Sequence, residues 1–239
     1  MKLDLLAIAA HPDDVELTCG GTLIKMSQLG YKTGVLDLTH GEMGTRGTPE
    51  IRLQEAQRAG EIMGVAVRAN LSLPDARLEV SEKYKLAVAA KIREWQPHTV
   101  ILPYWEGRHP DHYNAAKLSY EGCFLAGLKQ LSIPGEAFRP FKILYSTTYD
   151  ETVRPSFAVD ITAQFERRHE AILAYESQFR PKKRDDSSKV HIPLDELEDR
   201  VNLTSRHYGR MIGVKYAEPF LVREILQVDD VVKMPVRSI

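Results

Sequence analysis

Two short stretches of the sequence concentrate histidine and aspartate, the residue types that bind transition metals and transfer protons. The first reads His11-Pro12-Asp13-Asp14, and the second reads His109-Pro110-Asp111-His112. A single aspartate or histidine after a strand most often caps a helix or lies in a loop. Capping does not explain several ionisable groups beside a hydrophobic core, because burying each of them unpaired costs several kcal/mol. We therefore predict that the two stretches meet around a bound cation.

The ligand types predict a catalytic zinc site. Imidazole and carboxylate groups without a thiolate suit Zn²⁺, and Fe²⁺, Co²⁺ or Mn²⁺ can compete for them. Two histidines and one carboxylate leave a coordination position open for water, which is typical of catalytic zinc. Zinc lowers the pKa of such a water from about 15.7 to about 7, so hydroxide becomes accessible near neutral pH.

The two stretches contain more candidate groups than one zinc ion needs. Adjacent side chains diverge along an extended backbone, so one of Asp13 and Asp14 should bind the metal while the other acts as general base. If the second stretch opens a helical turn, His109 and His112 share a side, and one could bind metal while the other contacts the substrate. Asp111 lies between them and could fix the tautomer or the charge of an imidazole.

The surrounding elements predict an α/β fold with a mostly parallel sheet. Apolar strands alternate four times with amphipathic helices, which is the pattern of right-handed parallel crossovers. The predicted strands are 3–9, 33–38, 67–73 and 99–103, and the predicted helices end at Leu29, run from Thr48 to Gly64, run from Ser81 to Pro97, and span 114–131. Ligands bind at the carboxyl ends of such strands, where both stretches lie.

The pattern changes after residue 135. We predict strands at 141–149 and 157–161, helices at 162–179 and 193–212, and a charged solvent loop at 182–189. Neither an internal repeat nor a linker rich in Pro, Gly or Ser divides the chain. We expect one domain over 1–239, in which 1–135 carry the metal site and 136–239 complete the fold.

The composition argues against several classes of partner. The chain has 32 basic and 33 acidic residues and a net charge of −1, which disfavours nucleic acid or an anionic membrane. Apolar runs fall short of the ~20 residues of a membrane span, and the apolar start contains Asp4 and lacks a signal cleavage site. Cys19 and Cys123 are too few for a disulfide framework, so we expect a cytoplasmic protein. The sequence contains no G-x-G-x-x-G, phosphate-loop or G-x-S-x-G motif.

Several motifs together resemble the LmbE-like, or PIG-L, family of zinc-dependent N-acetylglucosaminyl deacetylases. They are 10–14, Gly20-Gly21-Thr22, Gly41-Glu42-Met43-Gly44 with Arg52 and Glu55 downstream, and 109–112. The segments 174–179 and 213–218 resemble the branch of this family that acts in bacillithiol biosynthesis. The resemblance implies a Rossmann-like three-layer fold and removal of acetate from N-acetyl-alpha-D-glucosaminyl L-malate.

The resemblance also implies a role for each residue of the two stretches. His11, Asp14 and His112 match the zinc ligands, and Asp13 matches the general base. His109 matches the group that stabilises the oxyanion or protonates the leaving amine, with Asp111 behind it.

Three arginines are the candidate substrate contacts. Arg52 and Arg108 fall where a malate carboxylate or a sugar hydroxyl could be held, and Arg46 lies in the loop ahead of Arg52. The planar guanidinium suits a carboxylate. Arg52 could equally be the ion-pair partner of Glu55.

Two other functions are compatible with the sequence. The enzyme could deacetylate a different N-acetylglucosamine conjugate, such as a lipid-linked, inositol-linked or chitooligosaccharide one. The chain could also bind metal without turnover, although a base beside an open coordination position would then serve no purpose. For the enzyme we expect Zn²⁺ as cofactor, a small amino-sugar substrate, no nucleic-acid or membrane partner, and a homo-oligomer.

Overall fold

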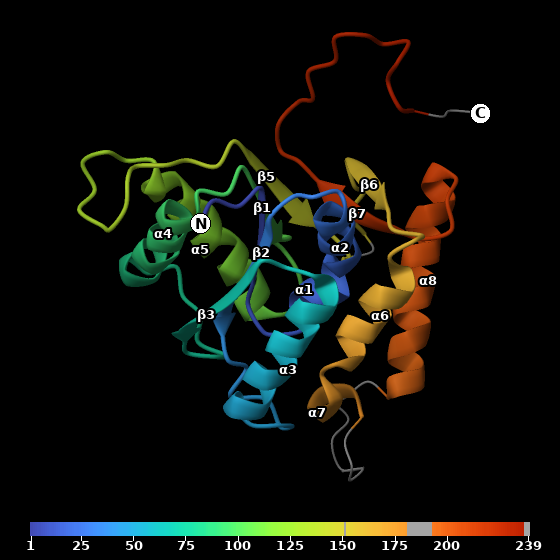
Figure 1. Cartoon of the computed structure of the whole chain (residues 1–239), viewed down its shortest axis with the longest axis horizontal. Coiled ribbons are helices and arrows are strands. Elements are labelled where there is room, and N and C mark those ends of the chain that lie inside the picture. Colours follow the sequence, from blue (N-terminus) through green and yellow to red (C-terminus); the bar gives the residue numbers. More distant parts are fainter. Residues whose placement is uncertain (151, 181–192, 237–239) are drawn as a thin grey trace.

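The computed structural model describes residues 1–150, 152–180 and 193–236, and in them a central sheet is covered by helices on both faces (Figure 1). The predicted loop at 182–189 lies outside the described residues. Among the described helices, none has both the length and the hydrophobicity needed to cross a bilayer.

The sheet confirms the predicted mostly parallel α/β architecture. Its strand order is β3-β2-β1-β4-β5-β7-β6. Five strands run parallel: β1 (Leu5–Ala9), β2 (Thr33–Thr39), β3 (Val67–Leu73), β4 (Thr99–Pro103) and β5 (Lys142–Ser146). Strand β7 (Ala217–Leu221) runs antiparallel to β5 and to β6 (Phe157–Asp160). Because the chain order reverses between β1 and β4, the carboxyl ends of these two neighbours form the switch point at which open α/β sheets bind ligands.

Helices pack on both faces of the sheet and create two cores. Strand β1 shows this directly, since Leu6 and Ile8 belong to the core under α4 (Glu82–Trp95) and α5 (Pro110–Ala126). Leu5 and Ala7 belong to the opposite core, under α2 (Gly20–Gln28), α3 (Pro49–Met63) and α6 (Phe165–Leu173). Burial on both faces explains why the strand is almost wholly apolar. Helix α8 (Leu194–Ile212) packs beside β6 and β7.

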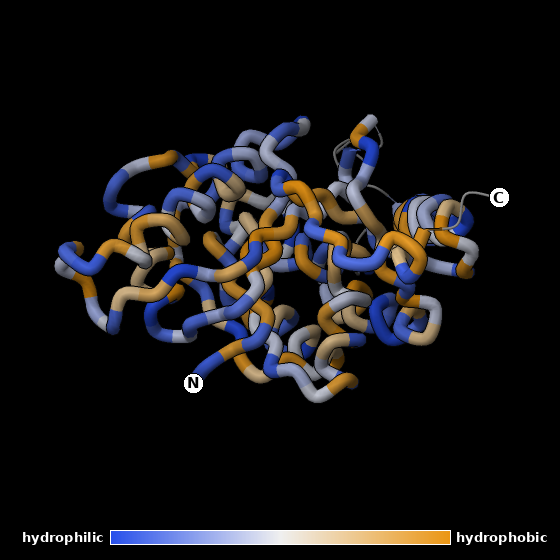
Figure 2. Tube along the Cα trace, turned by 90° about the horizontal axis from the view of Figure 1, so that it is seen from above, coloured by the Kyte–Doolittle hydropathy of each residue, from blue (hydrophilic) through white to orange (hydrophobic). Residues whose placement is uncertain are grey.

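Coloured by hydropathy, the chain shows hydrophobic segments both inside the body and at its periphery (Figure 2).

Thr48 accepts a hydrogen bond from the backbone N–H of Ile51, 3.3 Å away, and so caps α3 as the sequence predicts.

Helix α5 differs from the predicted span of 114–131. It begins at Pro110, whose fixed φ suits a first helical turn, and the ring of His109 accepts the backbone N–H of Asp111 as its cap. The second polar stretch therefore opens the helix instead of preceding it. The helix ends at Ala126, and the buried guanidinium of Arg93 binds backbone carbonyl oxygens of the loop that follows, including those of Leu128 and Ile133.

Three other elements also differ from the prediction. The first helix is divided at Cys19 into α1 (Asp14–Thr18) and α2, and the predicted helix 162–179 is divided into α6 and α7 (Glu176–Phe179). Strand β7 was not predicted, because Pro219 within it is unusual for an interior strand.

Candidate metal centre and catalytic cavity

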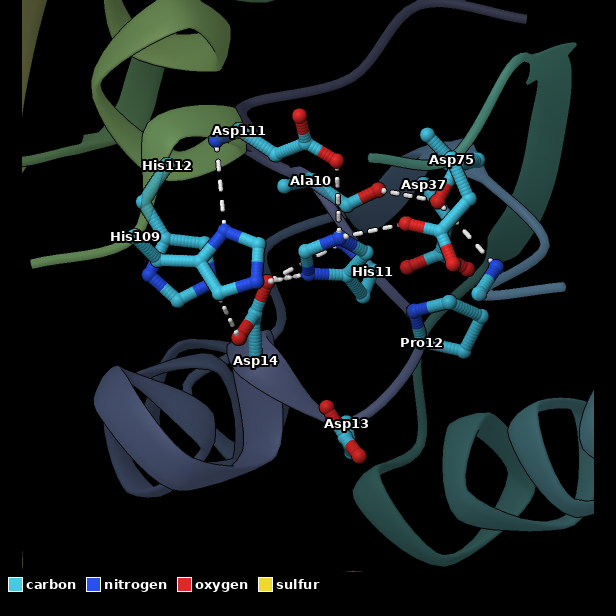
Figure 3. Close-up of polar contacts among 12 residues, drawn as sticks. Ala10, His11, Pro12, Asp13, Asp14, Asp37, Asp75, His109, Asp111 and His112 are labelled. Atoms are coloured by element: carbon cyan, nitrogen blue, oxygen red, sulfur yellow. Dashed lines mark hydrogen bonds and ion pairs between the residues drawn. The ribbon is translucent and has the colours of Figure 1, made fainter. Parts of the chain in front are cut away.

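The two polar stretches meet at the carboxyl ends of β1 and β4. Strand β1 pairs with β4 from Leu5 to Ala7, so the loops that leave these strands converge beyond the paired segment. Figure 3 shows His11 and Asp14 of the first loop facing His109, Asp111 and His112 of the second, with Asp13 to one side of this group. The predicted juxtaposition is therefore present in the fold.

His11, Asp14 and His112 form a compact group of potential metal ligands. One ligand atom from each lies within 4.8 Å of the other two. Asp14 Oδ2 lies 3.4 Å from His11 Nδ1, and Asp14 Oδ1 lies 3.2 Å from His112 Nε2. The backbone N–H of His11 also donates to Asp14 Oδ2 at 3.0 Å, which fixes the carboxylate. Burial opposes ionisation, but His112 and His11 hold the pKa of Asp14 well below its usual range. The group thus offers an ionised carboxylate between two imidazoles.

A second layer of carboxylates orients His11. Its Nε2 lies 3.0 Å from Asp75 Oδ1 and 3.2 Å from Asp111 Oδ2 (Figure 3). Burial lowers the pKa of His11, but hydrogen bonds to Asp111, Asp14 and Asp75 outweigh it and raise the pKa to about 12. Carboxylates that hold Nε2–H leave Nδ1 as the ligand atom, which is the usual arrangement around a metal-bound histidine.

Asp75 was not singled out from the sequence. It lies just beyond the carboxyl end of β3, and its Oδ2 accepts the backbone N–H of Met43 at 2.8 Å. Burial opposes the shift, but hydrogen bonds from His11 and Met43 lower the pKa of Asp75 to about 2. Its position in the sequence could have indicated this role, because Asp75 follows β3, whose carboxyl end lies at the same edge of the sheet as those of β1 and β4.

Asp111 contacts a different histidine from the one the resemblance suggested. Its carboxylate accepts the backbone N–H groups of Ala76 at 2.7 Å and Leu78 at 3.2 Å, and binds His11 from the opposite loop. Only its backbone N–H reaches His109, at Nδ1 and 3.2 Å. The Asp111 carboxylate is thus placed to orient His11, whereas the hydrogen bond from the Asp111 backbone N–H at the start of α5 orients His109.

His109 stacks at the edge of the ligand group. Its ring centroid lies 4.7 Å from that of His112 and 4.9 Å from that of His11. Burial and then the nearby His112 and His11 lower the pKa of His109, which favours the neutral ring. Because Nδ1 accepts a hydrogen bond, the neutral ring carries its proton on Nε2 and can donate from there. His11, His109 and Asp111 also form a second group of potential ligands.

Asp13 lies beside the ligand group in an unusual backbone conformation. Its φ of 105° is in the region that non-glycine residues rarely adopt. Such strain often occurs at functional sites. Burial raises the pKa of Asp13 to about 7, while Arg52 opposes the shift and Asp14 adds to it. A carboxyl group with this pKa suits a general base near neutral pH.

Arg52, a predicted substrate contact, is buried and bound within the protein. Its Nη2 donates to Pro12 O at 2.7 Å and approaches Asp13 Oδ2 at 3.3 Å, and its Nη1 donates to Gly41 O at 3.0 Å. A Cβ on Gly41 would lie 1.8 Å from Nη1, and Gly41 has a φ of +67°, so glycine is required here. Glu55, the other proposed partner of Arg52, instead accepts from the backbone and hydroxyl of Ser177.

The other two predicted arginines lie in different surroundings. Arg46 donates to Gln178 O at 2.9 Å, and the Gln178 amide donates back to Arg46 O at 2.8 Å, which ties this loop to α7. Arg108 is exposed and lines a cavity of about 750 Å³. Asp13, Asp14, His109 and His112 line the same cavity. Of the three arginines, Arg108 is the one placed to meet a ligand there.

Tyr149 is a further residue at the site that the sequence analysis missed. Its hydroxyl donates to Asp14 Oδ1 at 3.2 Å, and its ring stacks on His112 with centroids 5.4 Å apart. Tyr149 as a residue is 53% exposed, so it borders the ligand group on the solvent side. It lies just beyond β5, another strand whose carboxyl end faces the site.

The distant motifs that supported the resemblance brace the first loop and helix. The hydroxyl of Tyr175 lies 3.2 Å from Glu16 Oε1 behind the site. Glu218 accepts the backbone N–H groups of Gly21 at 2.8 Å and Thr22 at 2.7 Å at the start of α2. These motifs therefore brace α1 and α2, which follow the first polar stretch.

Residues 6–122, which include both polar stretches, match the family model described as PIG-L: GlcNAc-PI de-N-acetylase. A diacetylchitobiose deacetylase of Thermococcus kodakarensis is 32% identical over 233 residues, covering 90% of this chain and 80% of the relative. The chain belongs to the PIG-L family. Members of this family, also called LmbE-like, are N-deacetylases.

Two further proteins resemble this chain, one over nearly its whole length and one over about half of it. The crystal structure of the conserved protein TT1542 from Thermus thermophilus superposes with a TM-score of 0.84 and 39% identity, covering 95% of this chain and 98% of that one. A probable N-acetyl-alpha-D-glucosaminyl L-malate deacetylase 2 of Bacillus cereus is 33% identical over 125 residues, covering 47% of this chain and 57% of the relative. The predicted LmbE-like fold is thereby confirmed.

Proposed function

We propose that this PIG-L protein is a zinc-dependent N-deacetylase that hydrolyses N-acetyl-alpha-D-glucosaminyl L-malate to glucosaminyl malate and acetate. The observation that carries the activity is the position of Asp13. A carboxyl group with a pKa near 7 lies next to a three-ligand group at the wall of a cavity. We further propose that the enzyme works in the cytoplasm and as a homo-oligomer.

The residues present fit a zinc ion. His11, Asp14 and His112 supply two imidazoles and one carboxylate, and Asp75 and Asp111 orient one imidazole from behind. The buried carboxylates also give this point excess negative charge, which a divalent cation compensates. When bound there, zinc activates water and polarises the amide carbonyl.

The protein side chains divide the proton transfers between them. Asp13, in its ionised form, takes the proton of the water that attacks the amide carbonyl carbon. His109 donates a hydrogen bond from Nε2 to the charge that develops on the carbonyl oxygen. When the C–N bond breaks, the proton held by Asp13 passes to the departing nitrogen, so that acetate and a free amine are released.

The choice of the malate conjugate rests on sequence resemblance and on Arg108. This exposed guanidinium lies in the same cavity as Asp13 and suits a carboxylate. The 174–179 and 213–218 motifs make internal bracing contacts, so they support the fold more directly than the substrate. Another N-acetylglucosamine conjugate, such as diacetylchitobiose, is therefore the second candidate.

Acetate release from a panel of substrates tests the proposal. The purified protein should be assayed with N-acetylglucosaminyl malate, diacetylchitobiose and an N-acetylglucosaminyl inositol, after metal removal and after addition of zinc. We expect the highest kcat/KM on the malate conjugate and activity only with metal. Turnover confined to diacetylchitobiose would reject the malate substrate, full activity without metal would reject the zinc, and binding of zinc with no turnover on any substrate would favour a metal-binding protein.

A further inference from the structure

We infer that the C-terminal segment 224–236, called here the arm, packs against helix α5 of a second copy of this chain. The arm follows β7 and leaves the body of the molecule (Figure 1). This inference rests on the proposed homo-oligomer, for which it names the contact surfaces, and does not depend on the proposed chemistry.

The arm carries several large apolar side chains that are exposed. The exposed fraction is 99% for Ile225, 79% for Val231 and 89% for Val232. Its other exposed apolar residues are Leu226, Val228, Met234 and Val236. Its hydrogen bonds join arm residues to one another, as when Asp230 accepts the backbone N–H of Val232. Seven exposed apolar side chains within thirteen residues make the arm a candidate interaction surface.

Helix α5 carries an exposed apolar surface of its own, called here the aromatic stripe. Tyr113, Tyr120, Phe124 and Leu128 follow one another at helical spacing along α5 and just past its end, and all four are exposed. Residues at these intervals share one face of a helix. The opposite face of α5 is buried in the core through Ala115, Leu118 and Cys123. The stripe is therefore a second apolar surface on the same molecule.

The charges beside the two surfaces are complementary. The arm contains Glu224, Asp229, Asp230 and Lys233, which is three acidic groups against one basic group. The stripe lies beside Lys117, Lys129 and Arg139, and Glu121, an acidic neighbour on α5, is paired with Lys85 at 3.1 Å. The Arg139 guanidinium lies 4.5 Å from the ring centroid of Phe124. Opposite charges at the rim of an apolar contact favour one orientation over others.

The arm begins beside its own stripe and then leaves the body of the molecule. Arg223, the residue before the arm, already stacks on Tyr120 of the same chain with its guanidinium 5.0 Å from the ring centroid. From that point the chain continues away from the body (Figure 1). Reciprocal exchange of arms between two copies covers both stripes and closes the assembly with twofold symmetry.

Both surfaces lie near the second polar stretch. The guanidinium of Arg223 lies 4.2 Å from the ring centroid of Trp105, which belongs to the segment that leads to His109. Tyr113, the first residue of the stripe, directly follows His112. A partner arm packed along α5 therefore contacts the residue that follows the second polar stretch, while Arg223 of the same chain stacks on Trp105 before it.

Sedimentation of the full chain over a range of concentrations tests the inference. We expect the wild-type protein to be a dimer or a larger assembly. The double variant Val231→Asp and Val232→Asp should raise the dissociation constant by about 30-fold or more. Its two carboxylates replace apolar side chains in the contact and would have to lose their hydration there. Phe124→Asp should act in the same way from the other surface. Leu203→Asp is the matched control, since Leu203 is 65% exposed on α8 and lies outside both surfaces.

Cross-linking separates exchange from other arrangements. Cys19 and Cys123 are buried, so a cysteine introduced as Val232→Cys in one chain and as Phe124→Cys in a chain of different mass can be joined selectively. We expect a product that combines the two masses, with circular dichroism and Tm unchanged in each variant. A wild-type monomer at all concentrations, assembly unaffected by the arm and stripe variants, or cross-links only within one chain would each overturn the inference.

Discussion

Asp111 directs its carboxylate to His11 Nε2, 3.2 Å away and 100 positions earlier in the chain, and its backbone N–H to His109. The same carboxylate accepts two backbone N–H groups of the loop after β3. One side chain thus joins three strand ends around the candidate metal centre.

From this relationship, Asp111→Asn should weaken metal binding more than it changes the chemistry of the loaded enzyme. Loss of a carboxylate behind a metal-bound histidine lowers affinity by about 10- to 100-fold. Asp75→Asn should have a similar effect, because Asp75 holds the same imidazole nitrogen. Zinc titration by competition with a chromophoric chelator measures the affinity. An unchanged affinity together with a lower kcat would instead assign Asp111 to the reaction itself.

The pKa of Asp13 predicts the acid limb of the pH profile. Asp13 must be ionised to accept a proton, so kcat/KM should fall tenfold per pH unit below about pH 7. Arg52 lowers the pKa of Asp13, so Arg52→Gln should move this limb to higher pH, while Arg52→Lys should move it less. Rates measured across the pH range on one substrate decide the point. If the acid limb does not move in Arg52→Gln, then a group other than Asp13 causes it.

Substitution of a metal ligand should reduce zinc affinity, whereas substitution of the base or the oxyanion donor should reduce turnover only. Asp13→Asn and His109→Ala should keep near-stoichiometric zinc and lose about 10²–10⁴ in turnover. Asp14→Ala and His112→Ala should lose zinc affinity itself, because their side chains belong to the three-ligand group. Metal analysis of the four purified variants, beside their rates, tests this division. An empty site in Asp13→Asn or His109→Ala would contradict it.

Variants of Arg108 and Arg46 should have different effects, because Arg108 is placed to bind substrate whereas Arg46 supports a loop. Arg108→Ala should raise KM for N-acetylglucosaminyl malate by about 10- to 150-fold, since a charge-assisted contact is worth about 1.5–3 kcal/mol. It should change the kinetics on N-acetylglucosamine little, because that substrate has no carboxylate. Arg46→Ala should affect both substrates equally, because Arg46 holds the loop against Gln178. Equal losses in Arg108→Ala would remove the carboxylate contact from the proposal.

The sequence alone determined the parallel sheet and the meeting of the two polar stretches. Strands β1 and β4 are apolar because both faces of the sheet are covered, and that periodicity is local information. The position of the stretches after these strands then placed both stretches at one sheet edge, and the family resemblance singled out His11, Asp14 and His112 within them. These inferences needed only neighbouring residues and the general handedness of parallel crossovers.

Only the tertiary structure decided which partner each polar group has. Asp75 and Tyr149 enter the site from other strand ends, and Asp111 binds His11 instead of acting behind His109. Arg52 makes internal contacts to Asp13 and to backbone carbonyls. Contacts between residues far apart in sequence depend on how loops from different strands pack at one edge. Local periodicity and spacing carry no information on that packing, so the carboxylates around His11 could be recognised only after the strands were assembled.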